Sequence, residues 1–260
     1  MPELPLPLTI FVVTKNEENN LRRCLTSAAD LASELVVVDS GSTDGTEAVA
    51  REFGAQWHFQ EWLGFREQKK VALALCSQPW VLLLDSDEEI SAELRPELIA
   101  FLESGDLDEF DGAEFPRRTE FLGRWITHGD WYPDRKLRLF RRDRGVIGGD
   151  PEHEVVKVPG AVKRMRGDLN HYSFPTMLSF ISKIETFSNA FLENEIERGR
   201  RWSPIRTLTR PFWRFFRGYF LRRGFLDGFP GFWIAISVAY LSFIRYSRTY
   251  EHQKNEETAE

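Results

Sequence analysis

The apolar run at residues 80–84, Trp-Val-Leu-Leu-Leu, is followed at once by Asp85, Ser86 and Asp87. A continuous apolar run of this length is typical of a strand buried on both faces, as in a parallel sheet. Open α/β folds bind ligands beyond the carboxyl ends of such strands, and carboxylate oxygens are hard ligands that suit divalent cations. The run therefore predicts an α/β chain with two carboxylates at the ligand-binding edge of its sheet.

Strand and helix patterns alternate through the first hundred residues. Strands are expected at residues 9–13, 35–38, 55–59 and 80–84, and helices at 17–33, 46–53 and 68–76. Gly54 takes the C′ position after the second helix, where glycine commonly ends a helix. Strands separated by helices form right-handed βαβ units. We therefore expect a mostly parallel, Rossmann-like sheet flanked by helices, with the loops after the first, second and fourth strands at one edge.

The pattern changes at about residue 105 to short alternating runs separated by Gly, Pro and Asp, which favour antiparallel strands and long loops. Apolar residues then recur at helical spacing at Met177, Phe180, Ile184, Phe187 and Phe191. We expect a main domain at 1–197, divided near residue 104, and a helical extension at 198–260.

The net charge of −6 conceals an acidic body and a basic tail. Residues 1–197 carry 22 Lys and Arg against 35 Asp and Glu, whereas residues 198–260 carry 12 against 5. Cys24 and Cys76 fall in apolar helical patterns without a CxxC partner, so we expect buried thiols in a reducing compartment. The N-terminus lacks the basic and apolar regions of a signal peptide, which favours a cytoplasmic protein.

Two polar loops are expected at the same sheet edge as Asp85: residues 14–18, Thr-Lys-Asn-Glu-Glu, and residues 39–45, Asp-Ser-Gly-Ser-Thr-Asp-Gly. An Asp at a strand end can accept hydrogen bonds from a base or ribose, and small residues such as Ser42 let the backbone approach a ligand. The alternative is that Asp39 and its neighbours only form a turn and cap the next helix.

Asp85 and Asp87 would share one face if the strand continued through both residues. A turn after Leu84 is needed if one is to face a ribose and the other a metal ion. Mg²⁺ prefers one or two carboxylates together with substrate phosphates, and it would neutralise charge on a departing nucleoside diphosphate.

Three motifs resemble the family 2 inverting glycosyltransferases with a GT-A fold: Thr14-Lys15-Asn16-Glu17, residues 39–45 and residues 80–88. Further motifs resemble the lipopolysaccharide core branch of that family: Gly64-Phe65, Gln68-Lys69-Lys70, Trp131-Tyr132-Pro133-Asp134, residues 137–140, His153-Glu154 and residues 224–228. The resemblance covers nearly the whole chain. It implies a GT-A catalytic domain whose 1–104 half holds a nucleotide sugar and whose 105–197 half holds the acceptor.

The same resemblance, with the loop argument for Ser42, assigns candidate site residues. The nucleotide-sugar set is Thr14, Asn16, Glu17, Asp39, Ser42, Lys69 and Asp85, and Asp87 is expected to bind Mg²⁺ or Mn²⁺. His171 is a candidate second metal ligand because imidazole suits such ions. Trp125 and Trp131 are candidates for stacking on a sugar ring, although core packing is the alternative for both.

An inverting transfer needs a base that takes the proton of the acceptor hydroxyl. Many family members place this base in a Glu-Asp pair, whereas this chain has Glu152-His153-Glu154. Glu154 is the first candidate by motif position, followed by Glu152, His153 and Asp130. A hydrogen-bonded loop histidine is the alternative role for His153.

The tail carries nine arginines and no acid between Arg198 and Leu226. If Pro211 takes the N1 position of a helix, one face of that helix is aromatic and the other is basic. Phe212, Phe215 and Tyr219 lie on one face, with Arg214 and Arg217 on the other and Arg210 just before. Such a helix is expected to bind an anionic membrane surface. The apolar stretch at 231–244 is shorter than the roughly 20 residues that span a bilayer.

Two other roles for the tail are packing of its aromatic residues on the catalytic domain and binding of single-stranded nucleic acid. The acidic body disfavours nucleic acid, and we predict none as a partner.

We predict an inverting hexosyltransferase on the inner face of the cytoplasmic membrane, with UDP-glucose as donor and an inner-core heptose of lipopolysaccharide as acceptor. The alternatives are transfer to a polyprenyl-linked glycan and a non-catalytic protein that binds sugar nucleotides at the membrane. All of these require Asp39 and Asp87 to lie on the same side of the folded molecule.

Overall fold

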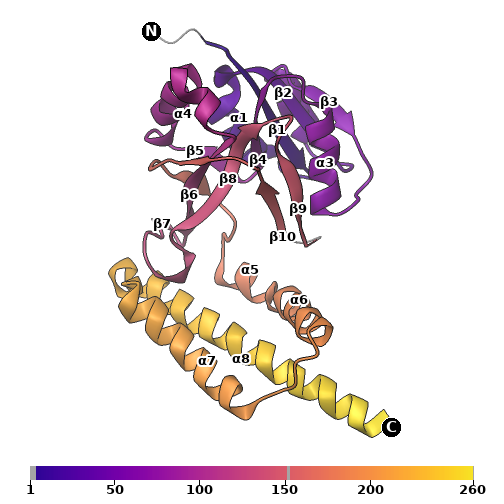
Figure 1. Cartoon of the computed structure of the whole chain (residues 1–260), viewed down its shortest axis with the longest axis vertical. Helices are drawn as coiled ribbons and strands as arrows, with labels where there is room; N and C mark the ends of the chain where they lie inside the picture. Colours follow the sequence, from indigo (N-terminus) through magenta and orange to yellow (C-terminus); the bar gives the residue numbers. More distant parts are fainter. Residues whose placement is uncertain (1–3, 151–152, 260) are drawn as a thin grey trace. The chain divides into compact units, whose positions relative to one another are not determined.

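The computed structural model describes residues 4–150 and 153–259, which form two compact units. The first unit comprises the chain up to Arg117 together with Asp134–His171. The second comprises Arg118–Pro133 and the chain from Tyr172 onward (Figure 1). Residues 118–133 and 172–197 belong to the second unit because they share its aromatic core. The functional boundary at residue 197 stays a prediction.

The first unit begins with four parallel strands separated by helices, as predicted. In chain order these elements are β1 (Leu6–Thr14), α1 (Glu18–Ala28), β2 (Ala32–Asp39), α2 (Thr46–Glu52), β3 (Gln56–Phe59), α3 (Phe65–Leu75) and β4 (Trp80–Asp85). The strands lie in the order β3-β2-β1-β4. Gly54 follows α2 with a φ of +72°, which confirms the glycine stop. The first helix is shorter than expected because a 3₁₀ turn at Ala29–Leu31 leads into β2.

The later strands extend the same sheet and make it mixed. They are β5 (Glu88–Ile90), β6 (Gly112–Phe121), β8 (Asp134–Arg141) and β12 (Leu169–His171), with short strands β7 (Arg124–Trp125) and β11 (Val162–Arg164) paired to β6. β8 runs antiparallel to both β4 and β6. A separate antiparallel hairpin joins β9 (Val146–Asp150) and β10 (His153–Lys157). The prediction of an α/β fold with short antiparallel strands after residue 105 is confirmed.

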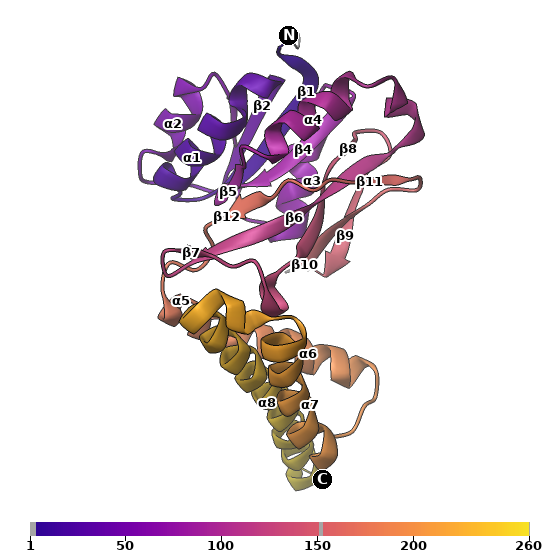
Figure 2. The ribbon, with the colours of Figure 1, turned by 90° about the vertical axis from the view of Figure 1, so that its left-hand side faces the viewer.

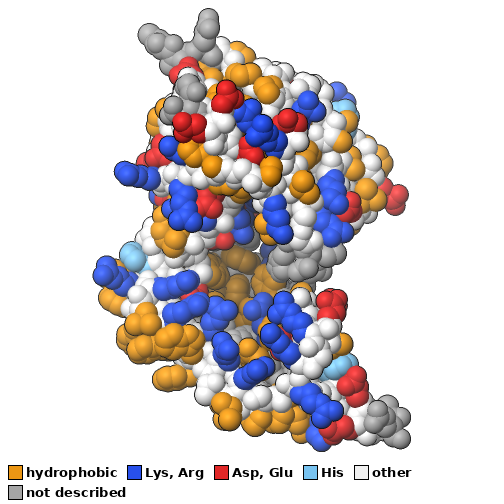
Figure 3. Space-filling model, in the orientation of Figure 1, with side chains coloured by type: hydrophobic (Ala, Val, Ile, Leu, Met, Phe, Trp, Pro, Cys, Tyr) orange, Lys and Arg blue, Asp and Glu red, His pale blue; other side chains and the backbone are white. Residues whose placement is uncertain are grey.

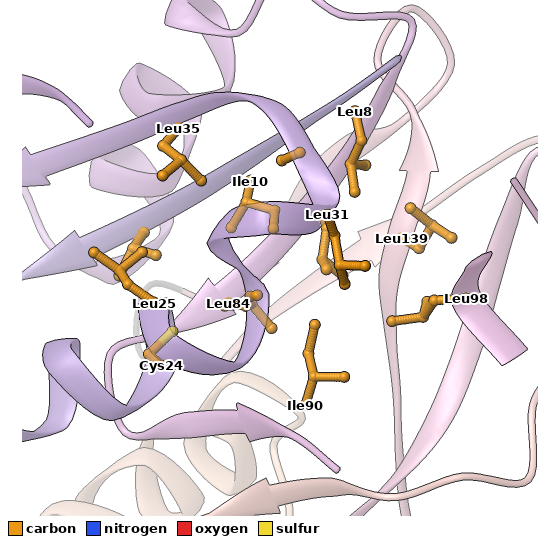
Figure 4. Packing of buried hydrophobic residues seen from close by; sticks show 14 of the residues in the cluster. Leu8, Ile10, Cys24, Leu25, Leu31, Leu35, Leu84, Ile90, Leu98 and Leu139 are labelled. Atoms are coloured by element: carbon orange, nitrogen blue, oxygen red, sulfur yellow. The ribbon is translucent and has the colours of Figure 1, made fainter. Parts of the chain in front are cut away.

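Both faces of the parallel strands are buried because α1, α2 and α4 (Leu94–Glu103) cover one face and α3 covers the other (Figure 2). On the first face, Ile10 of β1 and Leu84 of β4 pack with Cys24 and Leu25 of α1 (Figure 4). Cys76 packs on the opposite face. Both cysteines are buried free thiols, as expected.

The strand register brings the predicted loops together. Thr14 of β1 pairs with Asp39 of β2, and Val13 pairs with Asp85 of β4. All three strands are parallel and end within one residue of each other in this register. The polar segments that follow them therefore begin at the same edge of the sheet, as predicted.

The second unit has its own helices and its own aromatic core. The helices are α5 (Met177–Ile181), α6 (Ile184–Glu197), α7 (Pro204–Phe216) and α8 (Gly228–Ala259), with a π turn at Arg217–Leu221 and a 3₁₀ turn at Gly224–Asp227. Phe121 and Trp131 pack with Phe180 and with Trp233 of α8. These rings join residues 118–133 and 172–197 to the C-terminal helices, and they give Trp131 the core-packing role.

Two expectations about these helices were wrong. Residues 177–191 form parts of two helices rather than one, because the helix is interrupted near Ser182. Phe180, just before the interruption, packs against the rings of the aromatic core. Pro211 lies inside α7, because the helix begins earlier at Pro204, with Ser203 as its cap. A Ser-Pro pair at a helix start supplies both a cap acceptor and a residue with no N–H to satisfy.

The apolar residues 231–244 lie within a longer helix, α8. Within the described part of the chain, Gly224–Thr258 is the one helical segment long and apolar enough to cross a membrane, judged by length and composition alone. One third of its apolar window is buried (33%), since α8 packs against α6 and α7.

Candidate functional site

The loops that follow β1 and β2 are held together by hydrogen bonds. The backbone N–H of Asn16 donates to Ser42 Oγ at 2.8 Å, and the N–H of Thr43 donates to Asn16 Oδ1 at 2.8 Å. Asn16 takes a left-handed conformation, with a φ of 55°, which asparagine tolerates better than most residues. Asn16 and Ser42, both predicted site residues, are thus parts of one framework.

Asp39 uses its carboxylate to shape its own loop. Its Oδ2 accepts hydrogen bonds from the backbone N–H groups of Gly41 at 2.7 Å and Ser42 at 2.8 Å, and its Oδ1 accepts the Ser42 hydroxyl. The residue is buried. This is the turn-forming role that the sequence left open beside ligand binding, and a contact between Asp39 and a base stays a prediction.

A pocket of about 390 Å³ opens at this edge of the sheet. It is lined by Val13, Thr14, Lys15, Glu17, Trp62, Phe65 and Ser86. Thr14 Oγ1 is buried and has no hydrogen-bond partner among the described residues. The rings of Trp62 and Phe65 meet edge to face, with centroids 4.8 Å apart, and both are about half exposed. The pocket therefore combines an unsatisfied hydroxyl with accessible aromatic surface, which suits a polar ligand that carries a ring.

Trp62 was not among the predicted site residues, and Phe65 was noted only as part of the Gly64-Phe65 motif. The signal available was two aromatic residues in a polar loop between a predicted strand and a predicted helix.

The predicted turn after β4 separates its two carboxylates. β4 ends at Asp85, residues 86–87 form a turn, and β5 begins at Glu88. Asp85 contacts the Lys69 ammonium at 2.6 Å and also the Arg138 guanidinium. Asp87 instead lies with its Oδ2 at 3.3 Å from Nε2 of His171. The two carboxylates therefore have different partners.

Asp85 belongs to a buried network of charged side chains. Lys69, 2% exposed, also pairs with Glu154, and Arg138 lies 2.9 Å from the fully buried Glu88. Burial alone would raise the pKa of Asp85, but the positive charges of Arg138 and Lys69 outweigh burial and hold that pKa well below its usual range. Asp85 is therefore ionised at neutral pH.

The network extends through a second arginine. Arg117 bridges Glu88 at 3.0 Å and Asp134 at 2.7 Å. Burial lowers the pKa of the Arg138 guanidinium, but Asp85 and Glu88 more than offset that effect and raise it. These ion pairs hold Asp85 and Glu88, which flank the turn that contains Asp87.

Sequence analysis missed Glu88, Arg117 and Arg138 as site-forming residues. Arg138 had a usable signal, because it is a charge inside the apolar run Leu137-Arg138-Leu139-Phe140. Glu88 was noted only as the last residue of the motif at 80–88, and its pairing with arginines 29 and 50 residues away depends on the sheet order.

The pKa of Glu17 is raised by its surroundings. Burial raises the pKa of Glu17, and the negative charges of Asp87 and Asp44 raise it further, against a hydrogen bond from Asn20 that lowers it. The first loop and the turn after β4 are thus close enough to repel each other. A bound cation would relieve this repulsion.

The donor set at Asp87 and His171 fits a divalent cation that takes its remaining ligands elsewhere. One carboxylate oxygen and one imidazole nitrogen converge, and both side chains are largely buried. Within the described residues, no group of three or more His, Cys, Asp or Glu side chains is arranged to hold a metal ion. Mg²⁺ and Mn²⁺ commonly combine few protein ligands with phosphate oxygens and water.

The four candidate bases have different surroundings. Glu154 lies in the buried network beside Lys69. Glu152 lies outside the described residues, and His153 begins β10, without a described side chain. Asp130, in the second unit, is largely buried and contacts Arg217 at 2.8 Å, with two other arginines near it.

The second unit contains a His–Asp pair that sequence analysis also missed. His128 Nδ1 lies 3.1 Å from Oδ1 of the buried Asp227, which also accepts the backbone N–H of His128 at 2.8 Å. Asp227 lies in the motif at residues 224–228, which had been noted only as part of a resemblance.

The side chains predicted to bind a membrane are divided between packing and exposure. Phe215 and Tyr219 are half-buried against Phe232 of α8, and Arg217 pairs with Asp130. Phe212 is 72% exposed. Figure 3 shows hydrophobic side chains exposed beside Lys and Arg on the surface of the second unit. The exposed apolar side chains recur at three- and four-residue spacing: on α7 Ile205, Leu208, Phe212 and Phe216, in the π turn Phe220, and on α8 Phe229, Phe232, Ile236, Tyr240 and Phe243.

Comparisons with known proteins agree with the motifs. Residues 9–155 match the model of the family described as glycosyl transferase family 2. The lipopolysaccharide core biosynthesis glycosyltransferase LpsC of Rhizobium meliloti is 33% identical over 256 residues, which cover 95% of this chain and 93% of the relative. An uncharacterized glycosyltransferase of Rickettsia typhi is 28% identical over 94% of this chain and 87% of its own length.

Solved structures are more distant. Glucosyl-3-phosphoglycerate synthase from Mycobacterium tuberculosis, crystallised with Mn²⁺, UDP and glucosyl-3-phosphoglycerate, is 17% identical with a TM-score of 0.43. The match covers 65% of this chain and 73% of that protein. A TM-score of this size carries no argument about ligands.

Proposed function

Because this chain belongs to glycosyl transferase family 2, we propose that it transfers glucose from UDP-glucose, with inversion, to an inner-core heptose of lipopolysaccharide. The chain is a glycosyltransferase with a GT-A-like α/β fold. LpsC, a relative along nearly its whole length, supports the lipopolysaccharide acceptor.

One observation carries the donor half of this proposal. Three segments far apart in the chain line one pocket of about 390 Å³ at the sheet edge: residues 13–17, Trp62 with Phe65, and Ser86. Ser86 is followed directly by Asp87, which pairs with His171. Asp39 and Asp85 end β2 and β4, the two strands that flank β1, which supports placing Asp39 and Asp87 on the same side of the sheet.

We assign the pocket to the nucleotide and the Asp87 pair to the diphosphate end. Trp62 and Phe65 offer rings for the base, and Thr14 Oγ1 offers an unused polar atom. Asp87 and His171 would hold Mg²⁺ or Mn²⁺, which would supply positive charge against the leaving diphosphate. Asn16, Glu17, Ser42 and Lys69 shape or support this site through the contacts described above.

For the base we propose Glu154. Among the four candidates it is the one whose described side chain lies in the network that holds Asp85. Glu154 forms an ion pair with Lys69, and that pair must loosen when the carboxylate accepts the acceptor proton.

We also propose that the α7 and α8 helices place the enzyme on the cytoplasmic face of the membrane. The exposed apolar side chains on these helices, flanked by arginines, are the combination that binds an anionic bilayer surface. The contact uses Phe212 and Phe216, whereas Phe215 and Tyr219 support the helix pair from within.

The donor and acceptor are tested by offering a panel of nucleotide sugars, with Mg²⁺ or Mn²⁺, to lipopolysaccharides truncated at successive core sugars. The expected result is a product whose mass increases by one hexose, formed from UDP-glucose and only when the inner-core heptose is present. If the hexose is instead transferred to a polyprenyl-linked glycan, that glycan is the acceptor and the lipopolysaccharide proposal is wrong. Tight UDP binding with no acceptor product would identify a non-catalytic binder.

The membrane contact is tested by Phe212→Ser. Burying a phenylalanine side chain in an apolar phase is worth about 1.5–3 kcal/mol, so we expect vesicle affinity to fall by about tenfold or more. The measurement is co-sedimentation with phosphatidylglycerol vesicles. Phe59→Ser is the matched control, because Phe59 in the first unit is 69% exposed against 72% for Phe212. Equal losses in both variants would contradict the assignment of this face.

A further inference from the structure

A small pocket in the second unit gathers arginines from two helices. Its volume is about 150 Å³, and it lies where α6, α7 and α8 meet. Arg210 and Arg214, one helical turn apart, reach it from α7, and Arg245 reaches it from α8. The remaining lining residues are Phe191, Val238, Leu241, Ser242 and Tyr246. The lining therefore contains three cations, two hydroxyl groups and an apolar floor, with no carboxylate.

The neighbouring carboxylate does not neutralise these charges. Asp130 lies 3.8 Å from Arg214, but it already contacts Arg217 at 2.8 Å and Arg222 at 3.1 Å. The ion pairs of the described residues give Arg210 and Arg245 no carboxylate partner. Arg245 is held in place by its Nε–H, which donates to the carbonyl of Phe187 at 3.3 Å. Asp130 is thus shared among three guanidinium groups, and Arg210 and Arg245 add two further positive charges beside Arg214.

Holding these cations together costs free energy in the absence of an anion. Arginines at positions i and i+4 of a helix repel each other, as Arg210 and Arg214 do. Burial lowers the pKa of Arg245, and the nearby charge of Arg214 lowers it further. A bound anion would remove this strain, and the apolar floor would strengthen its attraction to the arginines.

We propose that Arg210, Arg214 and Arg245 form a binding site for a single phosphate group. Guanidinium groups offer forked donors that match phosphate oxygens, and three of them on two helices can contact different oxygens. Ser242 and Tyr246 add hydroxyl groups to the same pocket. The site is separate from the pocket assigned to the nucleotide, which lies in the first unit.

The phosphate has two possible sources, a lipid headgroup and a free or sugar-linked phosphate. The lipid source rests on the proposed membrane contact, because α7 and α8 also carry the exposed apolar side chains. The phosphate chemistry itself does not depend on the donor or the acceptor of the transferase.

The test compares Arg210→Gln/Arg245→Gln with a matched control, Arg198→Gln/Arg206→Gln, which removes the same charge from exposed positions. Thermal unfolding is measured in inorganic phosphate and in chloride at equal ionic strength. Saturating phosphate is expected to raise the Tm of the wild type and the control by about 3 °C or more, and to leave the pocket variant unchanged. Binding to phosphatidylglycerol vesicles is measured on the same preparations.

Each outcome decides the proposal. A phosphate-dependent Tm shift that is lost only in the pocket variant supports a site for free phosphate. Vesicle binding that weakens about tenfold only in that variant, without a Tm shift, supports a lipid phosphate. Identical behaviour of the pocket variant and the control in both assays would overturn the site. If the double variant does not fold, Arg210→Gln alone serves, since Arg210 is exposed. UDP binding by the wild type is measured in parallel. If the wild type does not bind UDP, the donor-site proposal fails, whatever the outcome for the arginine pocket.

Discussion

Asp87→Ala is expected to lower kcat/KM for sugar transfer by about 10³-fold and to remove the metal dependence of UDP binding. The reason is that Asp87 supplies the carboxylate oxygen of the proposed metal pair, 3.3 Å from His171, in a turn held by its own strand pairings. The side chain is not part of the buried network, so the variant should remain folded. Titration of UDP with and without Mn²⁺, together with product formation, checks this prediction.

Two further variants sharpen the result. Asp143→Ala removes an exposed Asp elsewhere in the first unit and should behave as wild type. Glu154→Gln should lose transfer while it keeps metal-dependent UDP binding, because a base acts on the acceptor rather than on the donor. Full activity of Asp87→Ala would remove the proposed metal role, and full activity of Glu154→Gln would remove that residue as the base.

Arg138→Ala is expected to reduce the free energy of unfolding by about 3–5 kcal/mol, the usual cost of removing one partner from a buried ion pair. The Arg138 side chain is 6% exposed and faces Asp85 and the fully buried Glu88. Its loss leaves these carboxylates with only Lys69 and Arg117 as counter-charges. Urea unfolding monitored by tryptophan fluorescence measures the change.

The comparison variant is Arg142→Ala, on the same segment but exposed, which should cost less than about 1 kcal/mol. A similar cost in both variants would contradict the importance of the network.

The pH dependence gives a second measure of the same interaction. The folded-state pKa of Asp85 is lowered, so its stabilising contribution is present above the ordinary carboxyl pKa of about 4 and is lost as the pH falls below it. The stability difference between wild type and Arg138→Ala should therefore be largest near neutral pH and should shrink under acid conditions. A difference that grew as the pH fell would exclude this ion-pair explanation.

The first half of the fold could be predicted because its signals are local. Each strand, helix and glycine stop before residue 85 lies in a short segment whose periodicity indicates its structure, and βαβ handedness then places the strand ends together. A turn after Leu84 was expected only on the condition that Asp85 and Asp87 have different roles, because side-chain alternation would otherwise put both on one face. Apart from the end of α1, the errors in the helices fell in the C-terminal region, where the break near Ser182 and the start of α7 at Pro204 depend on packing and capping.

The sequence by itself determined the family, the α/β core and the sheet edge where Thr14, Asp39 and Asp85 end their strands, because these follow from short-range patterns and chain topology. Only the tertiary structure decided which charges meet. Glu88 with Arg138, Asp130 with Arg217, and Arg214 near Arg245 join segments far apart in the chain, and no local pattern encodes such pairs. The division into two units has the same cause, since aromatic rings from three distant segments share one core around Trp233.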